Sequence, residues 1–112
     1  MSSINPQPHL IDGVDVPGVA EAVRACPGVA DLDEGLAGSV VSYLPGSRVP
    51  GVRVDAERVT VQIRAQWGVP VAELGRHVRA AVSPLVGGRT VDVVVSDIDT
   101  PASDGADSPG AG

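Results

Sequence analysis

The sequence predicts an α+β fold: a two-layer sandwich in which a mostly antiparallel sheet of three or four strands has two helices packed on one face. Residues 58–67 alternate polar and apolar side chains, which is the period of a strand with one buried and one solvated face. The segments that follow Asp15 and Pro70 repeat apolar residues every three or four positions, which is typical of amphipathic helices. A valine-rich run over residues 90–98 supplies a last strand.

Length and composition limit the class of protein. The 112 residues suffice for one domain with a buried core, and 43% of them are apolar while only 2% are aromatic. The core must therefore consist of Val, Leu, Ile and Ala. A formal net charge of −6 disfavours general binding to nucleic-acid phosphates, which requires a basic surface. The single cysteine, Cys26, excludes an intramolecular disulfide and suits a reducing, cytoplasmic setting.

The two ends of the chain are predicted to lie outside the folded domain, which we place at residues 14–99. Residues 1–13 contain two prolines and little periodicity, so we expect a flexible N-terminal arm. This arm lacks the pattern of a secretory signal, and no window approaches the ~18 consecutive apolar residues that insert into a membrane. Residues 100–112 contain too few apolar side chains to offset their ordering entropy, which predicts a disordered tail.

The first helix is predicted to begin after Asp15, whose carboxylate can cap the free N–H groups. Pro17 falls in the first turn, where a missing N–H is harmless, and Pro27 with the following glycine ends the helix. Cys26 is expected to be a small core residue and not a nucleophile. The apolar stripe that should face the core is Val16, Val19, Ala20 and Val23.

The middle of the chain, residues 28–51, gives a weaker pattern. Val29 to Leu32 can form a short strand, and residues 37–44 can pair at a sheet edge. Two proline-containing turns within residues 43–51 predict a loop with a defined path. This loop holds Tyr43, the only tyrosine, and Arg48, and it is either a rigid connector or a contact surface.

A hairpin is predicted where Val52 to Val54 lead through a short turn into the long strand. The positions expected to face the core are Val59, Val61, Ile63, Ala65 and Trp67. Arg53, Arg58 and Arg64 should project from the open face of the sheet together with Thr60 and Gln62. These arginines either keep the sheet soluble and discourage edge pairing, or they form a site for an anion or a partner.

The second helix and the last strand complete the predicted core. The helical stripe is Val71, Leu74, Val78, Ala81, Val82 and Leu85, and Pro84 is expected to loosen the last turn. In the last strand Val91, Val93 and Val95 should face inward, and Asp92 and Ser96 outward. Asp97 has the same parity, so it is either a carboxylate with apolar surroundings or a residue that reaches solvent at the strand end.

No sequence motif for catalysis is found. The chain has no Gly-rich phosphate loop, paired-cysteine metal site or nucleophile elbow, and its two histidines, His9 and His77, lie far apart. The acidic residues 31–34 lack the ligands and glycine spacing of a calcium loop, which predicts a solvated turn. We therefore expect no catalytic residue, no cofactor and no metal, and we interpret the chain as a binding or structural protein and not an enzyme.

Several segments together resemble a known family. These are Gly51-Val52-Arg53-Val54, the strand that ends at Trp67-Gly68, the helical segment from Val69 to Val82, and Val91-Asp92-Val93-Val94-Val95. Over roughly residues 14–99 they resemble the alkaline-shock, or envelope stress response, family of Gram-positive bacteria. The stretch over 43–51 is similar to short actinobacterial members of that family.

The resemblance implies a function without catalysis. It implies a cytoplasmic protein that gathers at the inner face of the cell membrane by binding a small membrane-anchored protein; some members self-associate, so a homo-oligomer is left open. Surface exposure makes five residues the candidate partner contacts: Tyr43, Arg48, Arg53, Arg58 and Arg64. The alternative is a small nucleic-acid-binding module, because sheets with two helices often bind RNA. The expected outward positions of this sheet carry no stacking aromatic residue, so we expect no nucleic acid.

Overall fold

A computed structural model describes residues 10–99 of the chain. The strands are β1 (Leu10–Ile11), β2 (Val14–Asp15), β3 (Val29–Leu32), β4 (Val41–Leu44), β5 (Ser47–Pro50), β6 (Val52–Val54), β7 (Arg58–Gln66) and β8 (Thr90–Asp99), and the helices are α1 (Val16–Arg24) and α2 (Val71–Val82), with 3-10 turns at Leu36–Gly38 and Ser83–Leu85. The predicted N-terminal residues 1–9, which include His9, and the predicted tail 100–112 lie outside the described residues.

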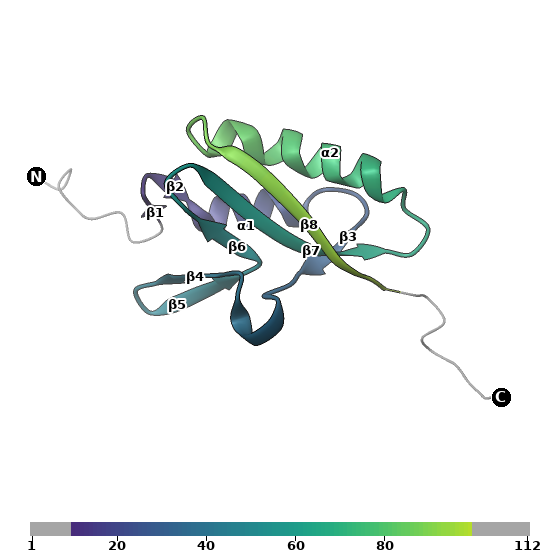
Figure 1. The fold of residues 1–112 in the computed structure, drawn as a ribbon, viewed down its shortest axis with the longest axis horizontal. Helices are drawn as coiled ribbons and strands as arrows, with labels where there is room; N and C mark the ends of the chain where they lie inside the picture. The colour runs from purple at the N-terminus through teal and green to yellow at the C-terminus, as the bar shows by residue number, and fades with distance from the viewer. Residues whose placement is uncertain (1–9, 100–112) are drawn as a thin grey trace, which may run out of the picture.

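The central sheet is built around β7 (Figure 1). β8 runs parallel to β7 along its whole length, and the opposite edge of β7 is shared by β6 and β3, which are both antiparallel to it. Parallel pairing follows from the crossover through α2, which returns the chain to the same end of the sheet. The predicted α+β fold is confirmed, with a mixed sheet of four strands.

Both helices pack on the same face of this sheet, α1 over β3 and α2 over β8 (Figure 1). Four inward side chains of β7 are 0% exposed: Val59, Val61, Ile63 and Ala65. The buried face predicted from the alternation is therefore confirmed at these positions. The helices contribute Val16, Val19, Ala20, Val23, Leu74, Val78 and Val82 to the same core. The core is thus aliphatic, as the composition requires.

The first helix begins and ends as its sequence predicts. Asp15 caps it, because its Oδ1 accepts a hydrogen bond from the Gly18 N–H at 3.0 Å, and Pro17 occupies the first turn. Cys26 is buried in the core, its Sγ donates to the Ala22 carbonyl at 3.4 Å, and burial raises the pKa of its thiol. This environment keeps the thiol protonated and confirms a packing role.

Two segments form more secondary structure than predicted. Residues 10–13 belong to the β1–β2 hairpin, in which Ile11 lies opposite Val14, so the flexible arm predicted over 1–13 is wrong for its last four residues. Residues 43–51 are not a loop: β4 and β5 pair as a hairpin, with Tyr43 opposite Arg48 and Val41 opposite Pro50. Pro50 is tolerated because it occupies the last position of its strand, where a ladder N–H is dispensable.

Three apolar side chains expected in the core are exposed. Trp67 is 62% exposed because β7 ends at Gln66 and the chain turns before the indole reaches the covered face. Val71 and Leu85 are 39% and 40% exposed, since they lie at the first residue of α2 and in the 3-10 turn that follows it. Pro84 lies in this turn, which agrees with the predicted loosening of the helix end.

A bulge in β8 decides where Asp97 points. Val95 lies opposite Ile63, but the next paired residue is Asp97, opposite Arg64, so Ser96 is the extra residue. The shift moves Asp97 to the open face and turns Ile98 toward the covered face. Of the two interpretations of Asp97, solvent exposure is correct.

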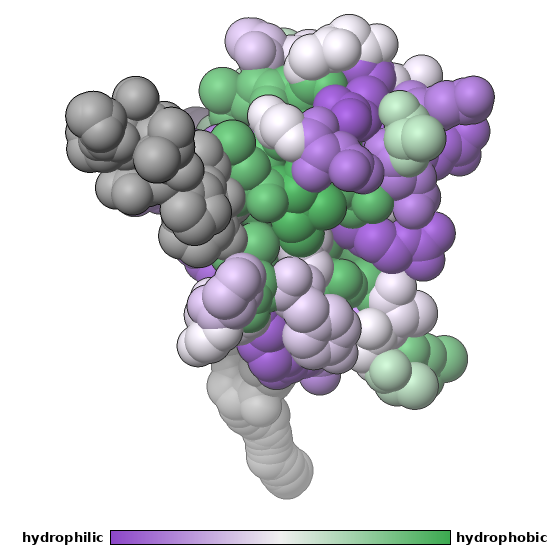
Figure 2. Space-filling view, turned by 90° about the vertical axis from the view of Figure 1, so that its left-hand side faces the viewer, coloured by the Kyte–Doolittle hydropathy of each residue, from purple (hydrophilic) through white to green (hydrophobic). Residues whose placement is uncertain are grey.

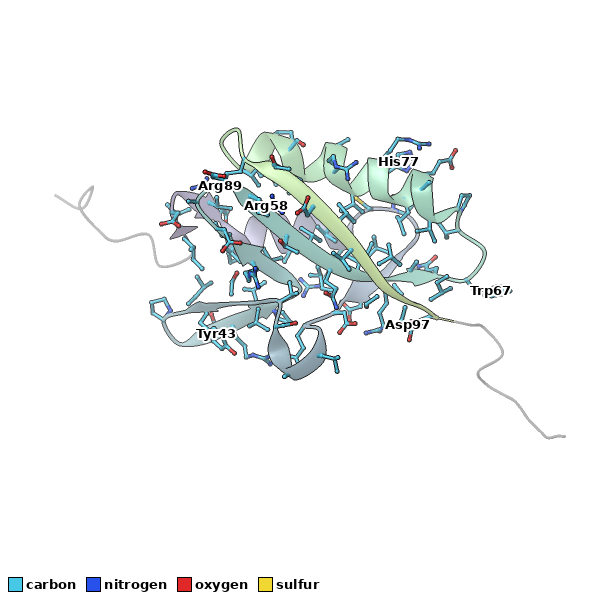
Figure 3. The ribbon with its side chains drawn as sticks, viewed as in Figure 1. Tyr43, Arg58, Trp67, His77, Arg89 and Asp97 are labelled. Atoms are coloured by element: carbon cyan, nitrogen blue, oxygen red, sulfur yellow. The ribbon has the colours of Figure 1, made fainter. Side chains whose placement is uncertain are left out.

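One end of the domain is held together by Arg89, which lies before β8 (Figure 3). Its guanidinium donates to the carbonyls of Asp12, Asp55 and Val86 at 2.9, 3.1 and 3.1 Å. These carbonyls belong to the β1–β2 turn, the β6–β7 turn and the end of the second 3-10 turn. Viewed from this end, apolar side chains gather at the centre of the picture, with polar side chains to their right and below them (Figure 2).

Candidate functional site

The face of the sheet opposite the helices is polar. Among residues 10–99 no helix covers it, and the outward side chains of β7 are Arg58, Thr60, Gln62, Arg64 and Gln66. Arg53 of β6 lies opposite Thr60 and shares this face. Three of the five predicted contact residues, Arg53, Arg58 and Arg64, therefore project where the sequence placed them.

The arginines of the sheet are paired with carboxylates. Arg58 Nη1 lies 2.7 Å from Asp92 Oδ2, and Arg64 Nε lies 3.1 Å from Asp99 Oδ1, both across the β7–β8 pair. Arg53 contacts Asp55 at 3.5 Å. Pairing with Asp99 raises the pKa of Arg64 further above its usual range. These guanidinium groups are thus already neutralised by the fold and do not form a free anion site.

The other two predicted contacts, Tyr43 and Arg48, lie on the β4–β5 hairpin next to this face. The segment 33–39 connects the two regions, because Arg48 pairs with Glu34 and Arg53 Nη1 donates to the Ser39 carbonyl at 3.3 Å. Tyr43 is 70% exposed. The structure therefore brings all five predicted residues onto one continuous surface, which we call the outer surface: the open sheet face, residues 33–39 and the hairpin.

The outer surface carries more acidic than basic groups. Its four arginines, Arg48, Arg53, Arg58 and Arg64, face six carboxylates, which gives a formal net charge of −2. The carboxylates are Asp33, Glu34, Asp55, Asp92, Asp97 and Asp99. Asp31 is left out because it pairs with Arg24 of α1 at 3.6 Å. A surface of this sign fits a polar or basic protein partner and repels phosphate backbones.

A hydrogen-bond network crosses the sheet at Asp33. The Ser96 hydroxyl reaches from β8 over β7 and donates to Asp33 Oδ2, and the Gly35 N–H donates to Oδ1 at 3.2 Å. These two bonds, followed by the positive charge of Arg64 and a bond from Gln62, hold the pKa of Asp33 below its ordinary value of 3.8. The network ties the two outer strands of the sheet to each other across β7.

This network makes a prediction about pH. Because folding lowers the pKa of Asp33, the ionised carboxylate stabilises the fold at pH values above the unfolded pKa, and this contribution is lost as the pH falls through the folded pKa. A carbon-13 NMR titration of the carboxyl groups should give a midpoint for Asp33 below that of an exposed aspartate. Ser96→Ala should raise the midpoint and Ser83→Ala should leave it unchanged. An unchanged midpoint in Ser96→Ala would contradict the network.

Sequence reasoning missed most of the acidic half of this surface. Asp92 and Ser96 were expected to face outward, and Asp92 does so opposite the outward Thr60. The ion pairs of Asp92 and Asp99 with arginines more than thirty residues away, and the outward position of Asp97 after the bulge, were not expected. The bulge itself has no glycine or proline to mark it.

Other reactive side chains do not gather into a catalytic arrangement. His77 lines a shallow pocket with Glu73 and Gln66, while Cys26 is buried in the core and is not among the residues that line this pocket. In the described part of the chain, no three of His, Cys, Asp and Glu are placed to hold a metal ion. Among residues 10–99, no helix has the length and apolar character needed to cross a membrane.

Comparisons with known proteins do not add a relative. No family model, no curated protein and no solved structure matches the chain.

Proposed function

We propose that this chain is a non-enzymatic protein of the envelope and alkaline stress response, which acts through protein–protein contact at its outer surface. The sequence resemblance over residues 14–99 supports the stress-response role. The observation that supports contact at this surface is that both helices lie on one side of the sheet, which leaves the other side free to meet a partner.

In this proposal a small membrane-anchored protein recruits the chain to the inner face of the cell membrane. The paired charges of the outer surface suit such a partner, because charged groups at an interface set specificity and association rate more than affinity. Tyr43 is the expected anchor, since it is 70% exposed and tyrosine is enriched among the residues that dominate binding energy.

Recruitment to membranes tests the proposal. In bacteria of the source species exposed to alkaline or cell-wall stress, the protein should co-sediment with the membrane fraction. Arg58→Gln and Arg64→Gln should each reduce this fraction severalfold, while their cost to folding stays below about 1 kcal/mol because exposed ion pairs contribute little.

The matched control is Arg76→Gln, which makes the same change on the exposed side of α2. It should leave the membrane fraction unchanged. Absence of the protein from membranes under both kinds of stress would refute the proposed role. Recruitment that is equal in all three variants would refute the outer surface as the contact.

A further inference from the structure

The edge of β8 that faces away from β7 has no partner strand in the described part of the chain. The Thr90 N–H donates to the Glu57 carbonyl at 3.0 Å, so the backbone groups of Thr90 point toward β7. Because successive residues of a strand direct these groups to opposite sides, those of Val91, Val93 and Val95 point to the free edge. This is confirmed at Val91, whose carbonyl accepts a bond from Arg79 Nε at 3.2 Å.

The second half of this edge is therefore an open row of hydrogen-bonding groups. Arg79 occupies only the carbonyl of Val91, and the backbone groups of Val93 and Val95 find no partner among the described residues. Such an edge can accept an extended chain as a further strand. The free edge from Val93 to the end of the pocket near Ile98 is long enough to pair with an added strand of about four to five residues.

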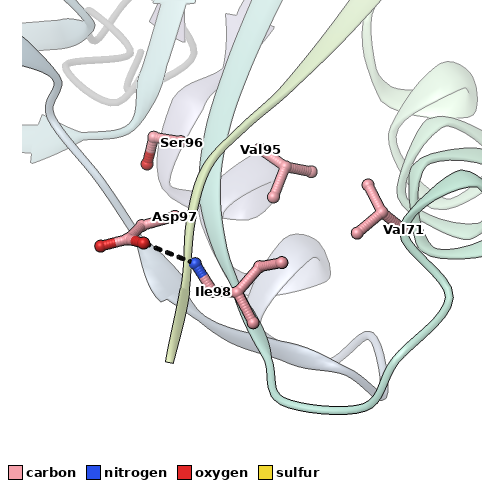
Figure 4. Close-up of a pocket in the computed structure, with 5 residues that line it drawn as sticks. All are labelled: Val71, Val95, Ser96, Asp97 and Ile98. Atoms are coloured by element: carbon pink, nitrogen blue, oxygen red, sulfur yellow. Dashed lines mark hydrogen bonds between the residues drawn. The ribbon is translucent and has the colours of Figure 1, made fainter. Parts of the chain in front are cut away.

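A pocket of about 330 Å³ opens between β8 and the first turn of α2. Val71, Val95 and Ile98 point into it, while Asp97 and Ser96 point to the other side of β8 (Figure 4). Arg79 lies two helical turns after Val71, and we call the strip from the pocket to Arg79 the groove. Gly75, one helical turn from both Val71 and Arg79, lies on the same flank of α2.

Gly75 keeps the middle of the groove open. No heavy atom lies within 4 Å of the position where a Cβ would stand, so neighbouring side chains do not require a glycine here. Glycine in the interior of a helix is unfavourable relative to alanine. Close packing therefore does not explain a glycine at position 75. Its lack of a side chain leaves space beside the edge of β8.

Charge selects what this edge can accept. The outward side chains of β8 next to an added strand are Asp92, Val94, Asp97 and Asp99. Asp97 has no arginine within ion-pair distance among the described residues. Like charges on neighbouring strands are destabilising and opposite charges are stabilising. A second copy of β8 would place aspartates beside aspartates, whereas lysine or arginine would complement them.

We propose that the free edge of β8 binds an extended basic segment of a partner protein as an added strand. Aliphatic side chains of the segment enter the groove at Val71, Val95 and Ile98, and a lysine or arginine of the segment lies beside Asp97, the carboxylate of this row that has no arginine partner among the described residues. The free edge of β8 borders the outer surface. The proposal of strand addition and the proposed stress-response function are independent, so one can be correct if the other is wrong.

A synthetic peptide with alternating valine and lysine or arginine, acetyl-KVRVKV-amide, tests the proposal with the full chain. In the free protein the amide of Val94 should exchange slowly with solvent, and those of Val93 and Val95 should exchange rapidly. Peptide at saturation should slow the exchange of Val93 and Val95 about tenfold or more by NMR, because their N–H groups gain partners. No change at these amides in the presence of peptide would overturn the proposal and leave the aspartates as protection against edge pairing.

Matched controls separate strand addition from simple charge attraction. A peptide with N-methyl groups on alternate residues keeps its charge but cannot form the ladder, and it should not bind; equal binding would overturn the proposal. Asp97→Lys should weaken the unmethylated peptide about fivefold or more, and Glu21→Lys, the same change on α1, should weaken it less than about twofold. Gly75→Leu should fill the groove and abolish binding, with an otherwise native spectrum. Full affinity in both Asp97→Lys and Gly75→Leu would contradict the assigned edge.

Discussion

Gly51→Ala is expected to lower the free energy of unfolding by about 3–5 kcal/mol, a large part of the stability of a small domain. Gly51 has φ of +84°, a conformation that costs a residue with a Cβ about 1–2 kcal/mol. A Cβ at this position would also stand 2.6 Å from Leu32 Cβ and 2.9 Å from the backbone oxygen of Gln62. Neither contact can relax easily, because Leu32 lies in β3 and Gln62 in β7, and these two strands are paired with each other.

The control for this variant is Gly46→Ala in the β4–β5 turn. Gly46 has nearly the same φ, +78°, but no heavy atom lies within 4 Å of its added Cβ. It should therefore show the conformational cost alone, about 1–2 kcal/mol. Urea denaturation monitored by circular dichroism gives both values. Equal losses in the two variants would contradict the close approach of Gly51 to Leu32 and Gln62.

Ile63→Ala is expected to cost about 2–5 kcal/mol, because it removes a large side chain from the centre of a close-packed core. Ile63 is 0% exposed, and it lies opposite Leu32 on one side and Val95 on the other. Ile63→Val, which removes one methylene group, should cost about 0.5–1.5 kcal/mol.

The neighbouring position provides the contrast. Gln62 precedes Ile63 in β7 but points to the open face, where it bonds to Asp33, so Gln62→Thr should lower the free energy of unfolding by no more than about 1 kcal/mol, the net contribution of one hydrogen bond. Thermal and urea denaturation give the free energy of unfolding of each variant. The loss should be larger at Ile63, on the covered face, than at Gln62, on the open face. A loss at Gln62 as large as that at Ile63 would mean that the outer surface is buried.

The local elements could be predicted from the sequence because their signals are local. Alternation along β7 identified its two faces, and Asp15 with Pro17 marked the start of α1. The signals failed at element ends: Trp67 continued the alternation, although the strand ends one residue before it. In residues 43–51 the prolines suggested a loop, but each occupies a turn or a strand end, where it interrupts no ladder bond.

The charge pattern of the candidate site could not be predicted, because it depends on strand pairing between distant segments. The sequence placed Arg58 and Arg64 on the open face, but their neutralisation by Asp92 and Asp99 requires the parallel register of β7 and β8. The bulge at Ser96 then adds Asp97 to the same face. The open face of β7 alone is basic, because it carries Arg58 and Arg64. The whole outer surface is acidic, because β8 adds its aspartates.

Solvent access at Val94, which lies opposite Gln62 on the open face, tests most directly whether the outer surface is open in the free protein and covered by a partner. In a Cys26→Ala background, the thiol of Val94→Cys should react with a maleimide rapidly in the purified protein because Val94 is 41% exposed, and a cysteine in place of Ile63 should react only on unfolding. On the membrane fraction of stressed cells, labelling at position 94 should slow severalfold, while a cysteine in place of Arg76 on α2 keeps its rate. Slow labelling at position 94 in the purified protein, or an unchanged rate on membranes, would contradict an open face that serves as the docking surface.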